Sequence, residues 1–483
     1  MTEERTSIHG QWSSKLAFIL AATGCAVGLG NIWKFPYITG ENGGGAFVIV
    51  YLVCIILMGL PVMMAEVLLG RRGKHSPINT MRYVAREEGA SSAWQIVGWS
   101  GVVAGFLILS YYSVIAGWAL AYIPIMAEGT FNAVQSLGSP DAVKQFAQDN
   151  FVTLISNPGA LIGWHTVFMV VTMIMVAGGV KGGLEKAVQF MMPALFLLLL
   201  VLLGYAISTG DYFITGVEFL FKVDFKALFY PNCTPDSCEF SGRGILVAMG
   251  QAFFTLSLGM GSIMVYGAYL SQKTSIAKTI AVVVAADTTV AILAGLVIFP
   301  IVFSNQLAPG AGPGLVFQTL PIAFGQMPWG AFFGTLFFIL LAFAAWSSSI
   351  SLLEPVVSWL VEATSFSRKV ICIFAGAFTW LIGLITVFSF NIWSDIKPLS
   401  HFAMFKNSTL FDLLDFLTAN IMLPLGGLAM AIFVAWIMRS EIVTRELKTT
   451  QNNFLYQVWL FALRFITPLG VGLVFLNAIG VFS

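Results

Sequence analysis

The segment at about residues 15–37 is apolar and long enough to cross a bilayer, yet it is poorly suited to a continuous helix. Asn31 and Lys34 lie in it, at a depth where polar side chains need partners. Hydrocarbon tolerates a broken helix only where protein or a cavity satisfies the freed backbone groups. We therefore predict a discontinuous transmembrane helix around a polar ligand, with a glycine-rich packing face as the alternative. Three glycines, each costing roughly 1 kcal/mol relative to alanine in a helix, support the break: Gly24, Gly28 and Gly30.

The composition is that of a protein with many membrane spans. Of 483 residues, 58% are hydrophobic and 10% are charged, whereas soluble domains carry about 25% charge. The polar N-terminus lacks the short apolar core and the cleavage site of a signal peptide, so the first apolar segment should stay as a span. Further apolar segments bring the predicted number of spans to eleven, at about 47–69, 94–125, 163–180, 187–207, 244–270, 277–303, 330–360, 370–390, 413–438 and 458–481.

Basic residues predict the orientation in the membrane. With the N-terminus inside, only seven of the 24 lysine and arginine residues fall outside, and this excess of inner positive charge is typical of cytoplasmic loops. We expect a multi-pass protein of the cytoplasmic (inner) membrane, with the N-terminus inside and, since the number of spans is odd, the C-terminus outside. The seven outer residues are Lys34, Lys144, Lys222, Lys226, Arg243, Lys397 and Lys406.

Two of the five cysteines, Cys233 and Cys238, share one long outer loop. An oxidising exterior favours a disulfide between them. Two free thiols or a weak metal site are the alternatives that the spacing leaves open.

A second interrupted span occupies the sixth position. In residues 250–262, which read GQAFFTLSLGMGS, hydroxyl groups and glycines break an otherwise apolar helix. Four spans separate it from the first broken span, so the pattern predicts two five-span repeats of opposite orientation and one extra span. Broken helices at matching positions of inverted repeats indicate a binding site near the membrane midplane. Helix N-termini attract a carboxylate and freed carbonyls attract cations, which suits a free amino acid.

Several motifs together resemble the neurotransmitter:sodium symporter family. They are WKFPY with ENGGGAF (33–47), the broken sixth span, YYSVIAGW (111–118), FAAWSSSISLLEP (343–355) and DLLDF (412–416). The similarity covers nearly the whole chain, and eleven spans are typical of a group of bacterial members. The resemblance implies an all-α polytopic fold in one transporter domain, residues 1–483, with broken helices 1 and 6. Its two inverted five-helix repeats would cover about 12–207 and 242–438, with an extra helix at about 455–483.

The resemblance also implies two sodium sites, and their oxygen ligands suit a hard cation. The first would use Ala26, Asn31, Thr255 and Asp287 together with the substrate carboxylate. The second would use Gly24, Val27, Ala344, Ser347 and Ser348, although serines in a span also serve helix packing.

Asp287 stands where the family usually has a neutral asparagine. A carboxylate there could bind sodium and also replace the chloride that animal members need. Ala291, one turn further on, cannot help bind an anion. We expect no chloride requirement.

The substrate site implied by the resemblance has a polar and an apolar end. The Tyr112 hydroxyl would meet the substrate carboxylate, and Phe254 would close the outer side. Because the other end is apolar, a charged substrate group would lack a partner there. Neutral, hydrophobic amino acids therefore fit best. The full set is Cys25, Ala26, Leu29, Gly30, Ile108, Tyr112, Phe254, Thr255, Ser257, Met260, Ser348 and Leu352.

Gates would close both sides of this site. Lys34 and Asp415 would pair on the outer side, together with Tyr112 and Phe254. Many members have arginine in place of Lys34, and lysine lacks its bidentate fork. On the inner side, His9 stands where the family often has arginine, and Glu362 is its expected partner, although both could be solvated loop residues.

Glu66 lies inside the second span, where an acid needs a partner. We expect it to face the protein interior and to bond freed backbone near the sixth span, in a structural or a coupling role.

These features predict a sodium-coupled symporter for neutral amino acids that works by alternating access. The expected partners are the amino-acid substrate and membrane lipid, with no nucleic acid. A proton-coupled or uncoupled permease of the same fold and a non-transporting amino-acid sensor are the alternatives. The sequence contains no HExxH metal motif and no Walker A loop, so we expect neither an enzyme nor an ATP-driven pump.

Overall fold

The computed structural model describes residues 7–231, 240–307 and 314–478. Cys233 and Cys238 lie outside the described residues, so the disulfide between them stays a prediction. Every regular element in the described part of the chain is helical.

Nine helices within these ranges are long and apolar enough to cross a membrane, and a bent helix pair forms a tenth candidate. The pair, Lys15–Ala26 and Gly30–Glu41, meets at an angle of 50°. Two shorter helices separated by a six-residue break, Arg243–Thr255 and Ser262–Ala268, occupy the predicted sixth span. The nine continuous helices are Gly45–Gly73, Ser92–Ala127, Pro158–Ala177, Val180–Ile207, Ile276–Ser304, Gly330–Ala363, Arg368–Ser389, Leu410–Ile437 and Phe454–Asn477.

The first broken span consists of α1 (Lys15–Ala26), η1 (Gly30–Lys34) and α2 (Phe35–Glu41). The side chain of Ser14 caps α1 by accepting from the Ala17 N–H. The helix ends because Val27 adopts an extended conformation, with ψ at 112°. The predicted break is therefore present, and it lies among the three glycines.

The second broken span consists of α12 (Arg243–Thr255) and α13 (Ser262–Ala268). In the break, Ser257, Gly259 and Gly261 have φ angles of 54°, 84° and 74°. A Cβ atom on Gly259 would lie 2.1 Å from the carbonyl oxygen of Leu423. Only glycine fits there, because the position combines a left-handed conformation with close backbone contact.

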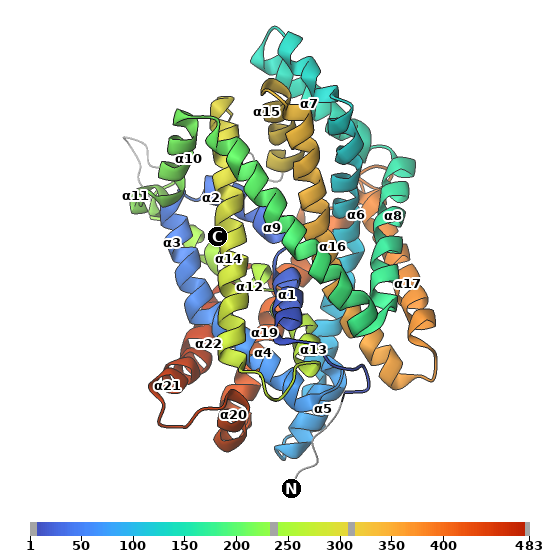
Figure 1. Ribbon diagram of the computed structural model, residues 1–483, viewed down its shortest axis with the longest axis vertical. Helices are drawn as coiled ribbons and strands as arrows, with labels where there is room; N and C mark the ends of the chain where they lie inside the picture. Colours follow the sequence, from blue (N-terminus) through green and yellow to red (C-terminus); the bar gives the residue numbers. More distant parts are fainter. Residues whose placement is uncertain (1–6, 232–239, 308–313, 479–483) are drawn as a thin grey trace.

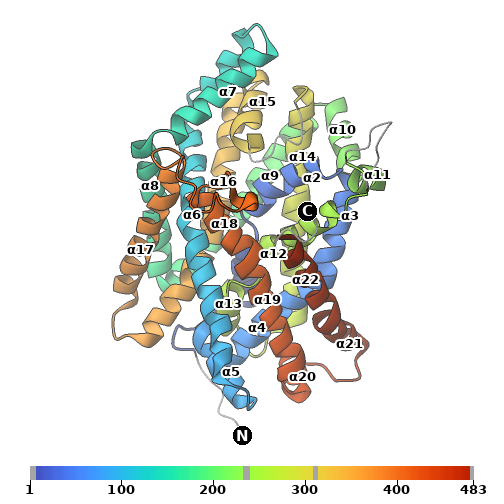
Figure 2. The same ribbon diagram turned by 180° about the vertical axis from the view of Figure 1, so that it is seen from behind.

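The two broken spans lie at the centre of the bundle in both views (Figures 1 and 2). Their neighbours in direct contact include α3, α4, α9, α14 and α16. The helices of the first half, in chain order, are α3 (Gly45–Cys54), η2 (Ile55–Gly59), α4 (Leu60–Gly73), α5 (Pro77–Glu87), η3 (Ser92–Trp94), α6 (Gln95–Ala127), α8 (Pro158–Ala177), η5 (Val180–Leu184) and α9 (Glu185–Ile207). Those of the second half are α14 (Ile276–Ser304), α16 (Gly330–Ala363), α17 (Arg368–Ser389), η7 (Ala403–Phe405), α18 (Leu410–Asp415), η8 (Phe416–Met422), α19 (Leu423–Ile432), η9 (Phe433–Ile437), α20 (Ser440–Leu447), α21 (Phe454–Phe461), η10 (Ala462–Ile466) and α22 (Thr467–Ala478).

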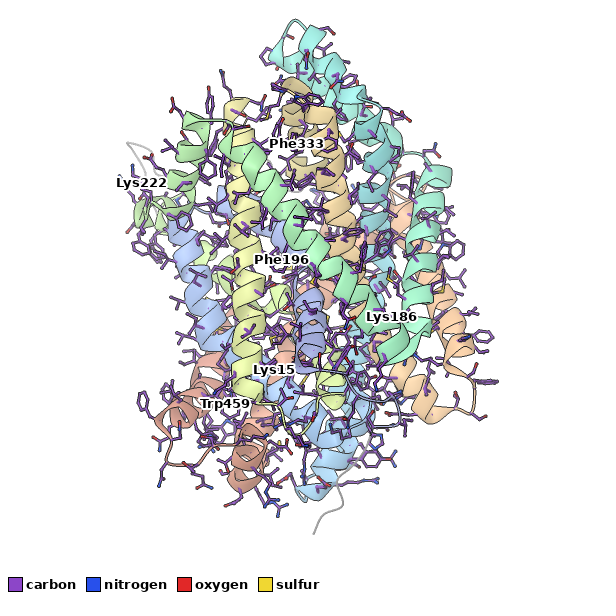
Figure 3. All side chains as sticks on the ribbon, in the orientation of Figure 1. Lys15, Lys186, Phe196, Lys222, Phe333 and Trp459 are labelled. Atoms are coloured by element: carbon purple, nitrogen blue, oxygen red, sulfur yellow. The ribbon has the colours of Figure 1, made fainter. Side chains whose placement is uncertain are left out.

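The long connections between the spans contain helices of their own. α7 and α15 lie at the end of the molecule opposite to α5 and α20 (Figure 1). Lys15 and Lys186 lie in the half that holds α5, whereas Lys222 lies in the other half (Figure 3). The helices within the long connections are η4 (Thr130–Ser136), α7 (Pro140–Ile155), α10 (Asp211–Phe221), α11 (Phe225–Phe229), η6 (Leu315–Thr319) and α15 (Leu320–Gln326).

Candidate functional site

The two helix breaks face each other and share hydrogen bonds. Ser257 Oγ donates to the carbonyl oxygen of Cys25 at 2.8 Å. Gln251 Nε2 donates to the carbonyl oxygen of Gly30 at 2.9 Å. Ser257 thus satisfies a carbonyl group next to the break in the first span, as burial without water requires, and Gln251 adds a side-chain contact between the two spans.

A small cavity of about 30 Å³ lies between the breaks. It brings together nearly all the residues predicted for the substrate site, from α6, α16 and the two broken spans. Cys25 and Thr255 are buried nearby but do not line it. The lining residues are Ala26, Gly28, Leu29, Gly30, Ile108, Tyr112, Phe254, Ser257, Met260, Ser348 and Leu352.

Gly28 is a lining residue that was not among the predicted substrate residues. A Cβ atom there would lie 2.5 Å from Ser348 Oγ and 3.2 Å from the Tyr112 hydroxyl oxygen. The backbone N–H of Leu29 donates to the same Tyr112 hydroxyl, at 3.4 Å. The Tyr112 and Ser348 hydroxyl groups therefore form one polar end of the cavity beside the Gly28 backbone, and the absence of a side chain at Gly28 leaves room for a ligand group. The local glycine pattern was the only sequence signal for this role.

The predicted first sodium site is centred on Asp287, which is fully buried in α14. Asn31 Nδ2 donates to Asp287 Oδ1 at 2.8 Å, and Asn31 Oδ1 accepts from the Gly28 N–H at 3.1 Å. Thr255 Oγ1 donates to Asp287 Oδ2 at 3.2 Å. Oxygen ligands of this kind suit a hard cation. A buried carboxylate also needs a positive charge nearby.

Two further groups near this site were not predicted. The Tyr51 hydroxyl and Gln251 Oε1 are buried and, within the described chain, have no hydrogen-bond partner. The Tyr51 ring packs against Phe35 of α2, with centroids 5.1 Å apart, and Gln251 bonds Gly30, the residue before Asn31. No pattern in the sequence separates these two side chains from ordinary packing residues of a span.

The five residues predicted for the second sodium site also come together, between α1 and α16. Ser347 Oγ lies 2.9 Å from the Ala344 carbonyl oxygen and 3.4 Å from that of Val27. Ser348 Oγ lies 3.2 Å from the Val27 carbonyl oxygen and 3.5 Å from that of Gly24. A cluster of two hydroxyls and three carbonyls supplies oxygen ligands without a formal charge.

The outer side of the site opens into a vestibule of about 480 Å³ whose lining includes Lys34, Phe254 and Asp415. Lys34 Nζ lies 4.3 Å from the centre of the Phe254 ring, a distance typical of a cation–π contact. Among the ion pairs of the described residues, none joins Lys34 to Asp415. The structure places both residues in one vestibule but does not bring their charges into contact, so the gate stays a prediction.

On the inner side the expected partners do meet. His9 Nε2 lies 3.1 Å from Glu362 Oε1. Both side chains are nearly completely buried, which differs from a pair of solvated loop residues. Ser76 and Asn79 also bond Glu362 and were not predicted.

Glu66 bonds the second helix break, as expected. Its Oε1 accepts from the Gly259 N–H at 2.6 Å. The side chain is fully buried in α4. Glu66 therefore anchors a backbone group that the break sets free.

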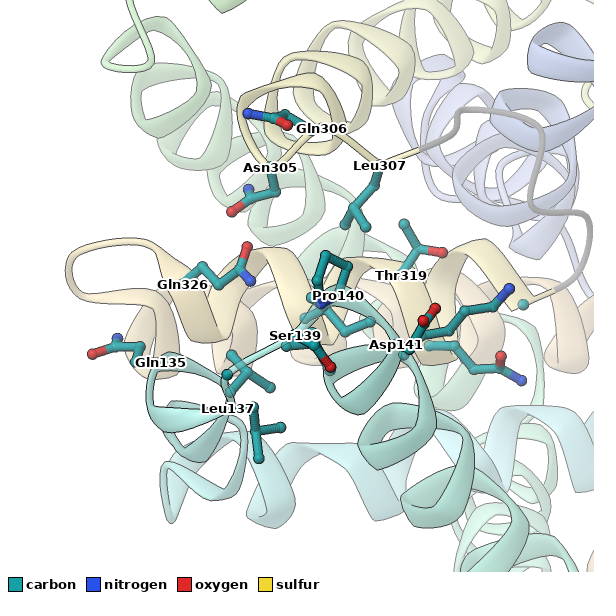
Figure 4. Close-up of a pocket in the computed structure, with 17 residues that line it drawn as sticks. Gln135, Leu137, Ser139, Pro140, Asp141, Asn305, Gln306, Leu307, Thr319 and Gln326 are labelled. Carbon is teal, nitrogen blue, oxygen red and sulfur yellow. The ribbon is translucent and has the colours of Figure 1, made fainter.

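A larger cavity of about 830 Å³ lies between η4 with α7 and the α14 end with α15 (Figure 4). Amide and hydroxyl side chains such as Gln135, Ser139, Asn305 and Gln326 line it. None of the predicted site residues is in it.

Comparisons with known proteins agree with this geometry. The model of the sodium:neurotransmitter symporter family matches residues 9–150 and 126–483. The chain is 37% identical over 476 residues to a sodium-dependent transporter of Bacillus subtilis, YhdH, which covers 98% of each chain. It is 32% identical over 470 residues to a sodium-dependent transporter of Haemophilus influenzae, covering 96% of this chain and 97% of that one.

A solved structure has the same fold. The crystal structure of MhsT in complex with L-phenylalanine matches with a TM-score of 0.84 and 39% sequence identity, covering 97% of this chain and 99% of that chain. The fold and the paired helix breaks thus define a secondary transporter. The chain belongs to the sodium:neurotransmitter symporter family and is a sodium-dependent transporter. The predicted fold class is confirmed, whereas the repeat boundaries stay a prediction.

Proposed function

We propose that this protein is a symporter that couples sodium entry to the uptake of neutral, hydrophobic amino acids. The observation that carries the proposal is the cavity between the helix breaks. One end presents the Tyr112 and Ser348 hydroxyls, and the other presents Ile108, Met260 and Leu352. Among the described residues that line it, none is charged, so a charged substrate side chain would have no partner. The L-phenylalanine complex of MhsT supports the same substrate class.

Sodium would act through the ligand groups around the two breaks. In the first site, the Asp287 carboxylate would compensate the cation charge, and the Asn31 and Thr255 oxygens would help coordinate the ion. In the second, the hydroxyls of Ser347 and Ser348 and the carbonyls of Gly24, Val27 and Ala344 would coordinate the ion between the first broken span and α16. Two sodium ions moving down about 100 mV and a tenfold gradient supply roughly 7 kcal/mol. That energy is sufficient to concentrate a neutral zwitterion by several orders of magnitude.

Access to the site would alternate between its two sides. Lys34, Asp415 and Phe254 would close the outer vestibule around a bound substrate, and His9 with Glu362 would close the inner side. We place the protein in the cytoplasmic membrane with its N-terminus on the cytoplasmic side, because basic residues are concentrated on that side.

Uptake into proteoliposomes tests this function. Labelled phenylalanine should accumulate with an inward sodium gradient and not with choline, and excess unlabelled leucine should compete while lysine and glutamate should not. Accumulation driven by a proton gradient without sodium would indicate the proton-coupled alternative. Saturable binding without any accumulation would indicate a sensor.

A further inference from the structure

Glu362, near the C-terminal end of α16, is surrounded by donors from two other parts of the chain. Its Oε1 accepts from the Ser76 N–H at 2.7 Å, and its Oε2 accepts from Ser76 Oγ at 2.5 Å and from Asn79 Nδ2 at 2.7 Å. Ser76 precedes α5, and Asn79 lies in its first turn. Glu362 therefore fixes the start of α5 to the end of α16.

Two histidines approach the same carboxylate oxygen. His9 Nε2 lies 3.1 Å from Glu362 Oε1, and His75 Nδ1 lies 3.4 Å from it. The exposed fractions of the His9, His75 and Glu362 side chains are 2%, 27% and 4%. His75 Nδ1 is buried and, in the described part of the chain, makes no hydrogen bond of good geometry. A partial contact of this kind would strengthen if the imidazole carried a positive charge.

The segment that carries His9 leads directly into the first broken span. Trp12 Nε1 donates to the Tyr266 carbonyl oxygen at 3.0 Å, and Ser13 bonds Glu185 of α9. His9 is thus one of several contacts that hold the chain before α1 against α13, α9 and α16. Movement of this segment must break the His9–Glu362 contact.

Charged and titratable groups from several helices surround the cluster. The ring of Tyr269, the residue directly after α13, packs against His9 with centroids 5.8 Å apart. The Tyr269 hydroxyl donates to Glu354 of α16, which is paired with Arg368 of α17. From α5, the Tyr83 ring lies 4.9 Å from the His75 ring, and Arg82 lies over Tyr83. Lys74, next to His75, donates to the Leu270 carbonyl oxygen at 2.5 Å.

We propose that His9, His75 and Glu362 form a proton-binding latch that closes the inner side of the transporter more firmly when the cytoplasm is acidic. Histidine is the side chain whose charge ordinarily changes between about pH 5 and 8. A protonated imidazole adds a charge-assisted hydrogen bond to the carboxylate, about twice as strong as a neutral one. An arginine or lysine in place of His9 would give a latch without this sensitivity. The inference rests on the proposed transport function for its physiological meaning.

The direction of the effect follows from the sign of the charges. Protonation of the two histidines stabilises the closed inner side. Acidification should therefore slow inward opening, and alkalinisation should speed it. We expect the initial rate of sodium-driven uptake to fall roughly fivefold as the internal pH is lowered from about 8 to about 5.5, the equivalent of about one kilocalorie per mole in the barrier. Binding of substrate from the outside should change little.

The transport experiment uses proteoliposomes with the external pH held constant and the internal pH varied. The chain has four histidines, which allows matched variants. The double variant His9→Gln with His75→Gln should transport at a rate independent of internal pH, and His9→Arg should give a slow, nearly pH-independent rate. His401→Gln, at an exposed position far along the chain, should follow the wild type. A double glutamine variant that keeps the wild-type pH profile would overturn the proposal.

A second measurement does not depend on transport. In detergent, the thermal unfolding midpoint of the wild type should exceed that of the double glutamine variant by more at about pH 5.5 than at about pH 8. A difference that is the same at both pH values would contradict the latch even if uptake is observed. Failure of the wild type to take up any amino acid would instead contradict the proposed function and leave this second measurement to decide the latch.

Discussion

Asn31 Nδ2 donates a 2.8 Å hydrogen bond to Asp287 Oδ1 and thereby joins the first broken span to α14. The contact places a carboxylate among neutral oxygen atoms at the centre of the bundle. Both side chains are fully buried. Such a carboxylate is stable only with a compensating cation or strong donors.

The first prediction concerns this carboxylate. Asp287→Asn should raise the sodium concentration for half-maximal uptake at least tenfold, about 1.4 kcal/mol, because the fixed negative charge is lost. Wild-type uptake should be unchanged when gluconate replaces chloride at constant sodium. A large loss of wild-type uptake on that replacement would exclude Asp287 as the substitute for chloride.

The second prediction concerns the hydroxyls of α16. The double variant Ser347→Ala with Ser348→Ala should also lose at least tenfold in apparent sodium affinity, about 1.4 kcal/mol. Ser349→Ala is a matched control, because Ser349 bonds Thr172 and the Trp346 carbonyl oxygen instead. Unchanged sodium dependence in the double variant, with normal amounts of protein in the membrane, would disprove the second sodium site.

The third prediction concerns the outer vestibule. Lys34→Ala or Asp415→Ala should reduce transport more than equilibrium binding, because closure of a gate commits the substrate. Exchanging the two charges should restore part of the rate. Lys222→Ala, at an exposed position outside the vestibule, serves as the control. Wild-type rates in both single variants would show that the residues do not form a gate.

The fourth prediction concerns Gly28. Gly28→Ala should weaken substrate binding at least tenfold, about 1.4 kcal/mol, since the added methyl group would occupy the space beside Ser348 Oγ and the Tyr112 hydroxyl. Gly250→Ala in α12 is the control, because a Cβ atom there meets no other atom within 4 Å. Equilibrium binding of labelled phenylalanine compares the two. Equal affinities would mean that the polar end of the cavity does not hold the substrate.

Sequence could predict the features that depend on local chemistry. Glycines and polar side chains at membrane depth indicated both helix breaks, and the motifs assigned Asn31 and Asp287 to one predicted sodium site and the α16 serines to another. Tyr51 and Gln251 could not be found in this way, because a tyrosine or glutamine in a span resembles any packing residue until its unsatisfied atoms are seen. The positions of Lys34 and Asp415 depend on how far the vestibule is closed, which no local pattern specifies.

His75, Ser76 and Asn79 illustrate the same limit on the inner side. The expectation that His9 meets Glu362 came from one position that differs from the family pattern. The other donors come from a connection that is distant in sequence from both residues. Their convergence depends on the packing of α5 against the end of α16.

The six residues between Thr255 and Ser262 divide one span into two short helices. The hydrogen-bond ladder of each helix already ends at the break. Tilting α13 while α12 stays in place therefore requires changes in a few backbone dihedral angles and no loss of helical hydrogen bonds. Because each such bond contributes about 1 kcal/mol, a continuous helix in this place would resist the same bend far more strongly. The break therefore lets the two halves of the span tilt independently of each other about the binding site.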